Sequence, residues 1–214
     1  MANINGAFGL RPIAKVGQNS NSMGVSGYTS YEIASGNSNV IYFGTPVIPL
    51  STGYIDVVGA AAGGTVGIAG AFMGCKYVSS TTGKPTWSNY WPGSGADSNH
   101  PVEAFVADDP MQLFAIATDA SWTSKATARA GVFANANFSS GTSGSTANGM
   151  SSAALAISTI ATTKTLNLRI MGWEDDPSNS DFAAAGIGVI VRLNNHFNSP
   201  NGAIVAGTTD SAGV

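Results

Sequence analysis

The chain has 214 residues, of which only 10% are charged, and its 12 acidic and 9 basic residues give a net charge of −3. This length is enough for one domain with a sizeable core, and the absence of clustered lysines and arginines argues against direct binding to nucleic acid. Because electrostatic repulsion between such weakly charged molecules is small, we expect partner proteins to cover much of the surface.

The cysteine and histidine content and the hydropathy of the chain argue against disulfides, zinc sites and membrane segments. The single cysteine, Cys75, rules out a disulfide within the chain, and two histidines without a CxxC or HxxxH spacing do not make a zinc site. We therefore expect no metal and no cofactor, with Cys75 as a small core residue. No apolar leader follows Met1 and no run approaches the roughly 18 apolar residues of a membrane span, which predicts synthesis in a cytoplasm and no membrane segment.

The N-terminal segment, residues 1–23, has no long periodic run and predicts an extended arm whose few apolar anchors dock on another protein. We expect residues 24–198 to form a single β-rich domain and residues 199–214 to form a flexible tail. The candidate partner-binding residues in the arm are Phe8, Leu10, Arg11 and Ile13.

Strand signals then follow one another, because glycine and proline repeatedly interrupt short runs of β-forming residues. Pro46 and Pro49 place the end of the second strand at an edge or a crossing, and three glycines in the third predict a bulge or bend. Residues 80–95 read as a hairpin, 121–132 as the one short helix, and 137–152 as a protruding or partner-ordered loop. The expected strands are in 25–34, 39–50, 65–80, 105–119, 163–173 and 186–198.

These elements predict a mainly β fold with an extended N-terminal arm and at most one short helix. A β-sandwich of jelly-roll type and a small barrel use the same alternation and turn residues, so both alternatives stay open.

Two clusters of acids, Asp108-Asp109-Pro110 and Glu174-Asp175-Asp176-Pro177, each adjoin an apolar strand. Aspartate accepts hydrogen bonds from backbone amides two residues on, and proline presets the next φ angle, so a structural turn is the favoured interpretation. A calcium site or an acid/base couple is the alternative, although neither cluster has the spaced oxygens of a calcium loop.

Other candidate sites are weaker. His100 and His196 fit turns better than catalytic bases, since no GxSxG presents a serine nucleophile. The glycine-rich residues 59–70 precede a strand, whereas a phosphate-binding loop would precede a helix. Aromatic side chains near strand ends could line a sugar-binding surface, but packing is the favoured role; these are Trp87, Tyr90, Trp91, Trp122 and Trp173.

Four stretches follow one another along the chain: NGAFGLRP (5–12), VADDPMQLF (106–114), LRIMGWEDDPSN (168–179) and VIVRLNNHFN (189–198). Together they resemble a family of small virion structural proteins of tailed bacteriophages, especially phages of marine bacteria and cyanobacteria. The resemblance covers residues 5 to about 198 and implies a non-enzymatic head protein without catalytic residues, a decoration or cement protein on the capsid surface that binds the major capsid protein.

Two principal hypotheses follow. The first is a capsid cement protein, a homotrimer whose arm anchors it to the lattice. The second is a head-fibre or tail-associated module that binds a host glycan through Trp87, Tyr90, Trp91 and the 139–152 loop. A hydrolase that uses Asp108, Asp109 or Glu174 is a remote third.

Overall fold

Strands dominate the structure, a computed structural model that describes residues 3–16, 27–60 and 67–199. Their pairing is antiparallel throughout, apart from a few isolated bridges. The predicted mainly β fold is therefore confirmed. The predicted short helix is also present: α1 (Lys125–Ala130) begins after Ser124, whose side chain accepts a hydrogen bond from the Thr127 amide as an N-cap.

Sheet A has six strands and contains most of the C-terminal half of the chain. Its inner face is built from apolar residues that alternate with outward-facing ones, as a half-buried sheet requires. In order across the sheet, its strands are β1 (Arg11–Lys15), β8 (Gln112–Ala117), β14 (Gly188–Leu193), β13 (Leu168–Trp173), β9 (Asn135–Ser139) and β12 (Ala154–Ala161).

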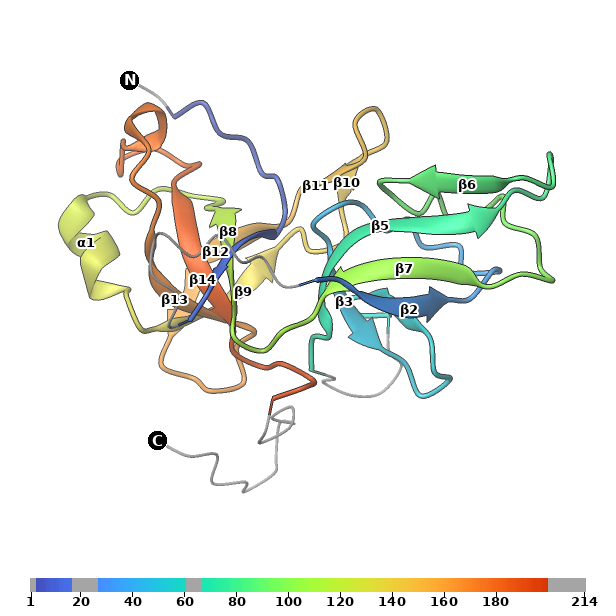
Figure 1. The fold of residues 1–214 in the computed structure, drawn as a ribbon. Helices are drawn as coiled ribbons and strands as arrows, with labels where there is room; N and C mark the ends of the chain where they lie inside the picture. Colours follow the sequence, from blue (N-terminus) through green and yellow to red (C-terminus); the bar gives the residue numbers. More distant parts are fainter. Residues whose placement is uncertain (1–2, 17–26, 61–66, 200–214) are drawn as a thin grey trace.

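Sheet B also has six strands and lies beside sheet A along the long axis of the molecule (Figure 1). A small hairpin of β10 (Gly144–Ser145) and β11 (Met150–Ser151) projects between the two sheets. The strands of sheet B are β2 (Thr29–Ile33), β7 (Val102–Ala107), β5 (Gly70–Val78), β3 (Pro46–Pro49) and β4 (Ile55–Val57), with β6 (Pro85–Ser88) paired to β5.

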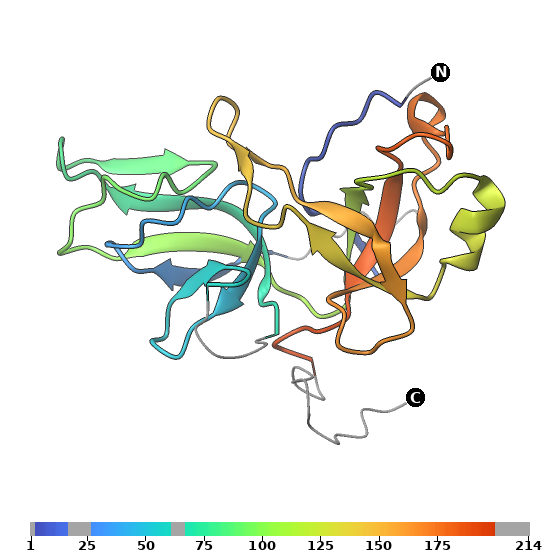
Figure 2. The same ribbon diagram turned by 180° about the vertical axis from the view of Figure 1, so that it is seen from behind.

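Neither sheet closes into a barrel within the described ranges. An isolated parallel bridge between Thr118 and Leu155, with hydrogen bonds between Asp119 and β12, brings the end of β8 beside β12, but it does not extend into a ladder. The view from behind shows the same side-by-side arrangement, with β7 in one sheet leading directly into β8 of the other (Figure 2). Of the two predicted alternatives, the sandwich-like arrangement of open sheets is the one the structure supports.

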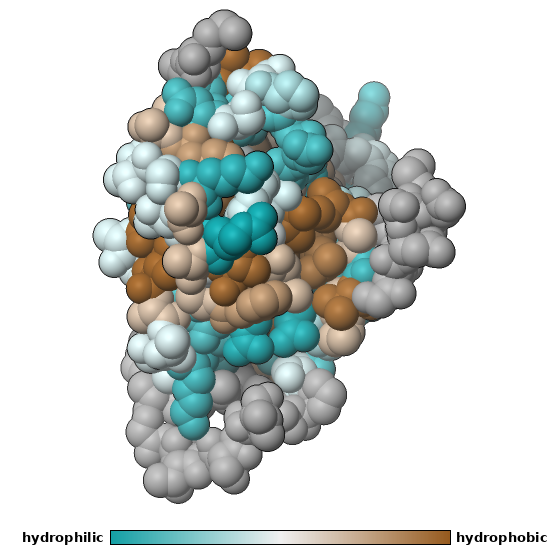
Figure 3. Space-filling model, turned by 90° about the vertical axis from the view of Figure 1, so that its left-hand side faces the viewer, coloured by the Kyte–Doolittle hydropathy of each residue, from teal (hydrophilic) through white to brown (hydrophobic). Residues whose placement is uncertain are grey.

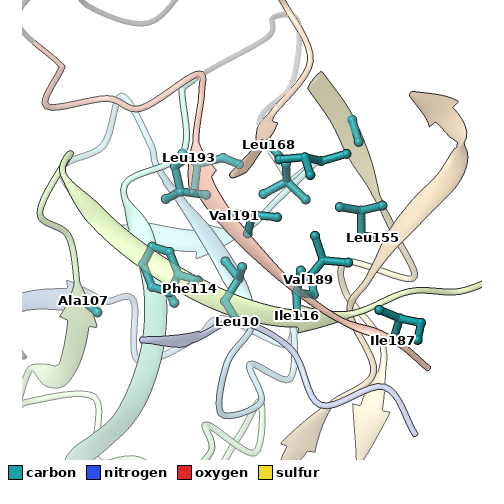
Figure 4. Close-up of a cluster of buried hydrophobic side chains, with 14 of the residues drawn as sticks. Leu10, Ala107, Phe114, Ile116, Leu155, Leu168, Ile187, Val189, Val191 and Leu193 are labelled. Atoms are coloured by element: carbon teal, nitrogen blue, oxygen red, sulfur yellow. The ribbon is translucent and has the colours of Figure 1, made fainter. Parts of the chain in front are cut away.

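Two apolar clusters form the core. The larger one covers the inner face of sheet A, where Phe114, Leu168 and Val191 meet Leu10 from the N-terminal segment (Figure 4). The smaller one lies on one face of sheet B around Phe72 and Trp91. Strands β3, β5 and β7 contribute to both clusters, because their successive side chains point to opposite faces.

A bulge in β5 occurs at one of the glycines that predicted it. The register with β7 shifts between Phe72 and Cys75, and Gly74 has a φ of +116°, a conformation that L-residues rarely adopt. A Cβ at Gly74 would also lie 3.0 Å from the Ser88 carbonyl oxygen. The bulge therefore depends on glycine for both conformation and space.

The N-terminal segment differs from its prediction. Leu10 is fully buried in the larger cluster, and the following residues form β1, the edge strand that pairs with β8. Asn3 donates to the carbonyl oxygens of Asp181 and Ala185, so the segment is held by the body of the same chain. The prediction that Leu10 contacts a partner is wrong, because its side chain is already enclosed. The expected boundary at residue 23 and the expected tail, apart from Ser199, lie outside the described residues.

Other predictions have mixed outcomes. Strand β3 lies between β4 and β5, but its pairing with β5 covers only Pro46 and Val47 among the described residues, so its end at Pro49 is paired there on the β4 side alone, in agreement with the predicted edge. The segment 137–152 is not one loop, because it includes the end of β9 and the β10–β11 hairpin. Strand β12 was not predicted, since its sequence ALAISTIA consists largely of small residues with weak strand preference.

Candidate functional site

The Asp108–Asp109 pair forms the turn that carries the chain from sheet B to sheet A, as predicted. The Asp109 carboxylate accepts a hydrogen bond from the Met111 amide at 2.8 Å and lies 2.5 Å from the Lys15 ammonium. Asp108 accepts from the Tyr31 hydroxyl at 2.7 Å. Burial of Tyr31, reinforced by this hydrogen bond to Asp108, raises the pKa of the phenol. The turn is therefore bonded to both sheets, through Asp108 to β2 of sheet B and through Asp109 to β1 of sheet A.

The second acid cluster is also a turn. Asp176 caps the 3₁₀ helix η1 (Pro177–Asn179) by accepting from the Ser178 amide and the Asn179 side chain. These hydrogen bonds lower the pKa of the Asp176 carboxyl, and the one from the Asn179 side chain has the larger effect. Glu174 instead forms an ion pair with Arg11 at 2.6 Å.

The two histidines occupy different environments, and neither ring has a serine or cysteine nucleophile as a hydrogen-bond partner among the described residues. His100 is exposed and its Nδ1 lies 3.2 Å from an Asp97 carboxylate oxygen. His196 is buried, and its Nδ1 accepts from the Asn198 amide at 3.0 Å. Burial lowers the pKa of His196. Cys75 is a buried core residue, as predicted, and burial raises the pKa of its thiol to about 12.

The four predicted partner-binding residues do not form one surface. Leu10 is in the core, whereas the guanidinium of Arg11 lies over the Phe8 ring, 5.2 Å from its centroid, and also pairs with Glu174. Ile13 is half-buried at the irregularity where β1 shifts register against β8. Phe8 and Ile13 are partly accessible, and Arg11 is exposed on the edge strand.

The aromatic residues divide between core and surface. Trp91 is fully buried and Tyr90 stacks on Tyr42, so the predicted glycan platform of Trp87, Tyr90 and Trp91 is not present as such. Trp87 alone of the three is exposed, at 67% of its surface.

Trp87 belongs to a different aromatic patch, which we call the Trp87 patch and define as Trp87, Phe105 and Tyr28. The Trp87 ring stacks on Phe105 from β7, with ring centroids 5.8 Å apart and planes within 7°. It reaches across β5 at the bulge, where Gly74 has no side chain to block it. A groove of about 350 Å³ runs along the patch and is lined also by Ser88 and Asn89.

Further large apolar side chains are exposed at the opposite end of the molecule. Phe133, which follows α1, is 74% exposed, and Ile4 is exposed in the N-terminal segment. Figure 3 looks at the end of the molecule formed by sheet A and α1, and it shows patches of apolar surface interrupted by hydrophilic side chains. This mixed surface agrees with the low charge of the sequence.

A second candidate surface is the outer face of sheet A, which we define by Met111, Leu113, Ile190, Arg169 and Arg192. Arg169 on β13 is directly opposite Arg192 on β14, and Arg192 is in turn opposite Leu113 on β8. The guanidinium of Arg192 lies 3.9 Å from the sulfur of Met111. The pairing of these two arginines depends on strand register and was not predicted from the sequence.

In the described part of the chain, no three His, Cys, Asp or Glu side chains gather as a metal site, and no helix is long and apolar enough to cross a membrane. No family model, curated protein or solved structure matches the chain. The candidate sites are therefore two surfaces, the Trp87 patch and the outer face of sheet A, each suited to binding.

Proposed function

We propose that the protein is a non-enzymatic structural component of a tailed-bacteriophage virion, a decoration or cement protein that binds and stabilises the lattice of the major capsid protein. The observation that carries this proposal is the Trp87 patch. Exposed tryptophan and tyrosine side chains are among those that dominate binding energy at protein interfaces. On a chain with so few charges, such a patch favours a protein partner.

The four stretches that carry the resemblance to phage head proteins lie close together in the fold. Residues 5–12, 106–114, 168–179 and 189–198 contribute to β1, β8, β13 and β14, which are neighbours in sheet A. Stretches far apart in sequence thus form one continuous unit. The acids of two of these stretches form turns and an ion pair.

The proposal places the protein on the capsid surface as a homotrimer, with no contact to nucleic acid or membrane. A standard protein interface buries about 1,600 Å², and several such contacts for each subunit would make dissociation slow. Binding at several points on the lattice would strengthen attachment further through effective concentration.

Co-sedimentation with purified capsids that lack the protein tests this function. The full-length chain is expected to saturate the capsids at a fixed stoichiometry, and Trp87→Ala is expected to weaken binding by about tenfold or more. Phe133→Ala is the matched control, because it removes an equally exposed aromatic ring far from the patch. If the wild-type chain does not bind capsids at all, the cement proposal fails.

A glycan-binding recognition module is the second candidate, and the groove along the Trp87 patch favours it. The flat indole can stack against the C–H face of a sugar ring, while Asn89 and Ser88 offer polar groups for hydroxyls. A glycan array probed with wild type and Trp87→Ala tests this candidate. Binding of a defined glycan by the wild type alone, without capsid binding, would establish it in place of the cement role.

A further inference from the structure

The outer face of sheet A carries two arginines in an arrangement that is unfavourable in the isolated chain. Arg169 and Arg192 are direct cross-strand partners, so their Cβ atoms are within roughly 5 Å and their charges repel each other. Both side chains are half-buried, which limits screening by solvent. Burial, together with the charge of Arg169, lowers the pKa of Arg192.

Neither arginine forms an ion pair with an acid in the described residues. The ion pairs there join Arg11 to Glu174, Lys15 to Asp109, Lys76 to Glu103 and, when the histidine is protonated, His100 to Asp97. The Nε of Arg169 donates to the Asn135 side-chain oxygen at 3.2 Å, a neutral acceptor.

Arg192 is the less well satisfied of the two. Its Nε is buried and makes no hydrogen bond within the described part of the chain, and its Nη1 reaches only the weakly accepting sulfur of Met111. A buried unpaired N–H and a like charge directly opposite both destabilise the folded state. A residue kept at such a position is explained by a contact that the isolated chain does not make.

We propose that the Arg169–Arg192 pair is the centre of a docking site for an acidic segment of a partner protein, with a carboxylate held between the two guanidinium groups. A planar guanidinium binds a carboxylate through two parallel N–H donors, and the register of β13 and β14 puts two such groups on directly opposed positions. Met111, Leu113 and Ile190 surround the pair with apolar surface that would exclude water from the bound carboxylate and strengthen the interaction.

The surroundings favour a protein ligand over nucleic acid. Binding along a phosphate backbone needs several spaced cations, whereas this face offers two arginines among apolar side chains. An apolar rim of this kind matches an acidic side chain that is flanked by apolar residues. If the partner is the major capsid protein, the inference rests on the proposed function. The docking site itself can be tested without capsids.

The first measurement is stability, because it separates a functional pair from a structural one. Arg192→Gln is expected to raise the urea midpoint of unfolding, since it removes the repulsion from Arg169 and a charge with a buried unpaired N–H. Arg129→Gln is the control, because Arg129 is an exposed arginine that lies over the Trp173 ring and faces no other arginine. A lower midpoint for Arg192→Gln would show that the arginine stabilises the chain and would overturn the inference.

The second measurement is binding of a hexaglutamate peptide to the full-length chain at low ionic strength, followed by NMR of the arginine Nε–Hε signals. The signals of Arg169 and Arg192 are expected to shift, and Arg192→Gln and Arg169→Gln should each weaken binding at least tenfold, whereas Arg129→Gln should not. A hexaglutamine peptide should not bind. Equal binding by the arginine variants, or binding of duplex DNA in preference to the peptide, would overturn the proposal.

Capsid co-sedimentation then distinguishes the two proposals. If wild type and Arg192→Gln bind capsids equally, the cement function stands and the capsid does not occupy the docking site. If the peptide binds as expected but capsids do not, the docking site stands and the capsid is not its partner.

Discussion

His196 is a buried histidine at the junction of the two sheets. Its backbone forms an isolated bridge with Ile68, where the segment after β14 meets the segment before β5. Its Nδ1 accepts from the Asn198 amide, so the neutral ring carries its hydrogen on Nε2. Burial and the charge of Arg192 lower its pKa, while the nearby Asp108 and Asp109 act in the opposite direction and do not cancel the effect.

This environment predicts a pH dependence of stability. The unfolded chain keeps a histidine pKa near 6.5 and the folded chain has a lower one, so between the two values the unfolded state binds more protons. The free energy of unfolding should therefore be independent of His196 above about pH 7.5. It should fall as the pH drops through 6.5 toward the folded pKa.

This pH dependence can be measured by urea unfolding between neutral and mildly acidic pH. The proteins to compare are wild type, His196→Gln and His100→Gln. The fall in stability should disappear in His196→Gln, whatever that variant's stability at neutral pH, and persist in His100→Gln, whose ring is exposed. An unchanged pH profile in His196→Gln would show that other groups are responsible.

Residue roles could be predicted from the sequence where they are local. The Asp109 turn was predictable, because an aspartate bonds the amide two residues later whatever the rest of the fold does. The roles of Trp87 and Trp91 could not be separated, because which face of a strand is covered depends on distant segments. The Arg169–Arg192 pair was hidden for the same reason, since register between β13 and β14 is not written in either strand alone.

At the scale of elements, β1 shows why the N-terminal segment was misjudged. Its sequence has only a few apolar residues, and a single edge strand needs no more, because pairing with β8 supplies its backbone hydrogen bonds. Strand β12 was missed for a related reason, since its small residues are fixed by pairing with β9 and by burial. By contrast, β5, β8 and β14 were predictable from long apolar runs.

Because Leu10 lies within the larger core cluster, the segment should be part of the cooperative fold and not a detachable arm. Leu10→Ala is expected to lower the free energy of unfolding by about 2–5 kcal/mol, the range for a buried leucine that leaves a cavity. Ile4→Ala, at an exposed position, should change it by less than about 0.5 kcal/mol.

Urea denaturation followed by circular dichroism measures both variants. If Leu10→Ala is as stable as wild type, the N-terminal segment does not contribute to the fold, and its deletion would leave the body intact as the sequence suggested.

For the molecule as a whole, the two apolar clusters share their strands. In β5, Ala71 and Met73 face the cluster of sheet A, while Phe72 and Cys75 face the cluster of sheet B. In β7, Ala107 belongs to the first cluster and Val106 to the second. A strand of this kind that unfolds would remove side chains from both clusters at once, so we expect the two sheets to unfold together.

The shared strands predict one cooperative unfolding transition, with tryptophan fluorescence and far-ultraviolet circular dichroism giving coincident curves. Phe72→Ala, in the cluster of sheet B, and Leu155→Ala, in the cluster of sheet A, should each lower the free energy of unfolding by about 2–5 kcal/mol without splitting the transition. Two transitions, of which Phe72→Ala moves only one, would instead mean that the sheets fold independently and that β5 and β7 do not couple them.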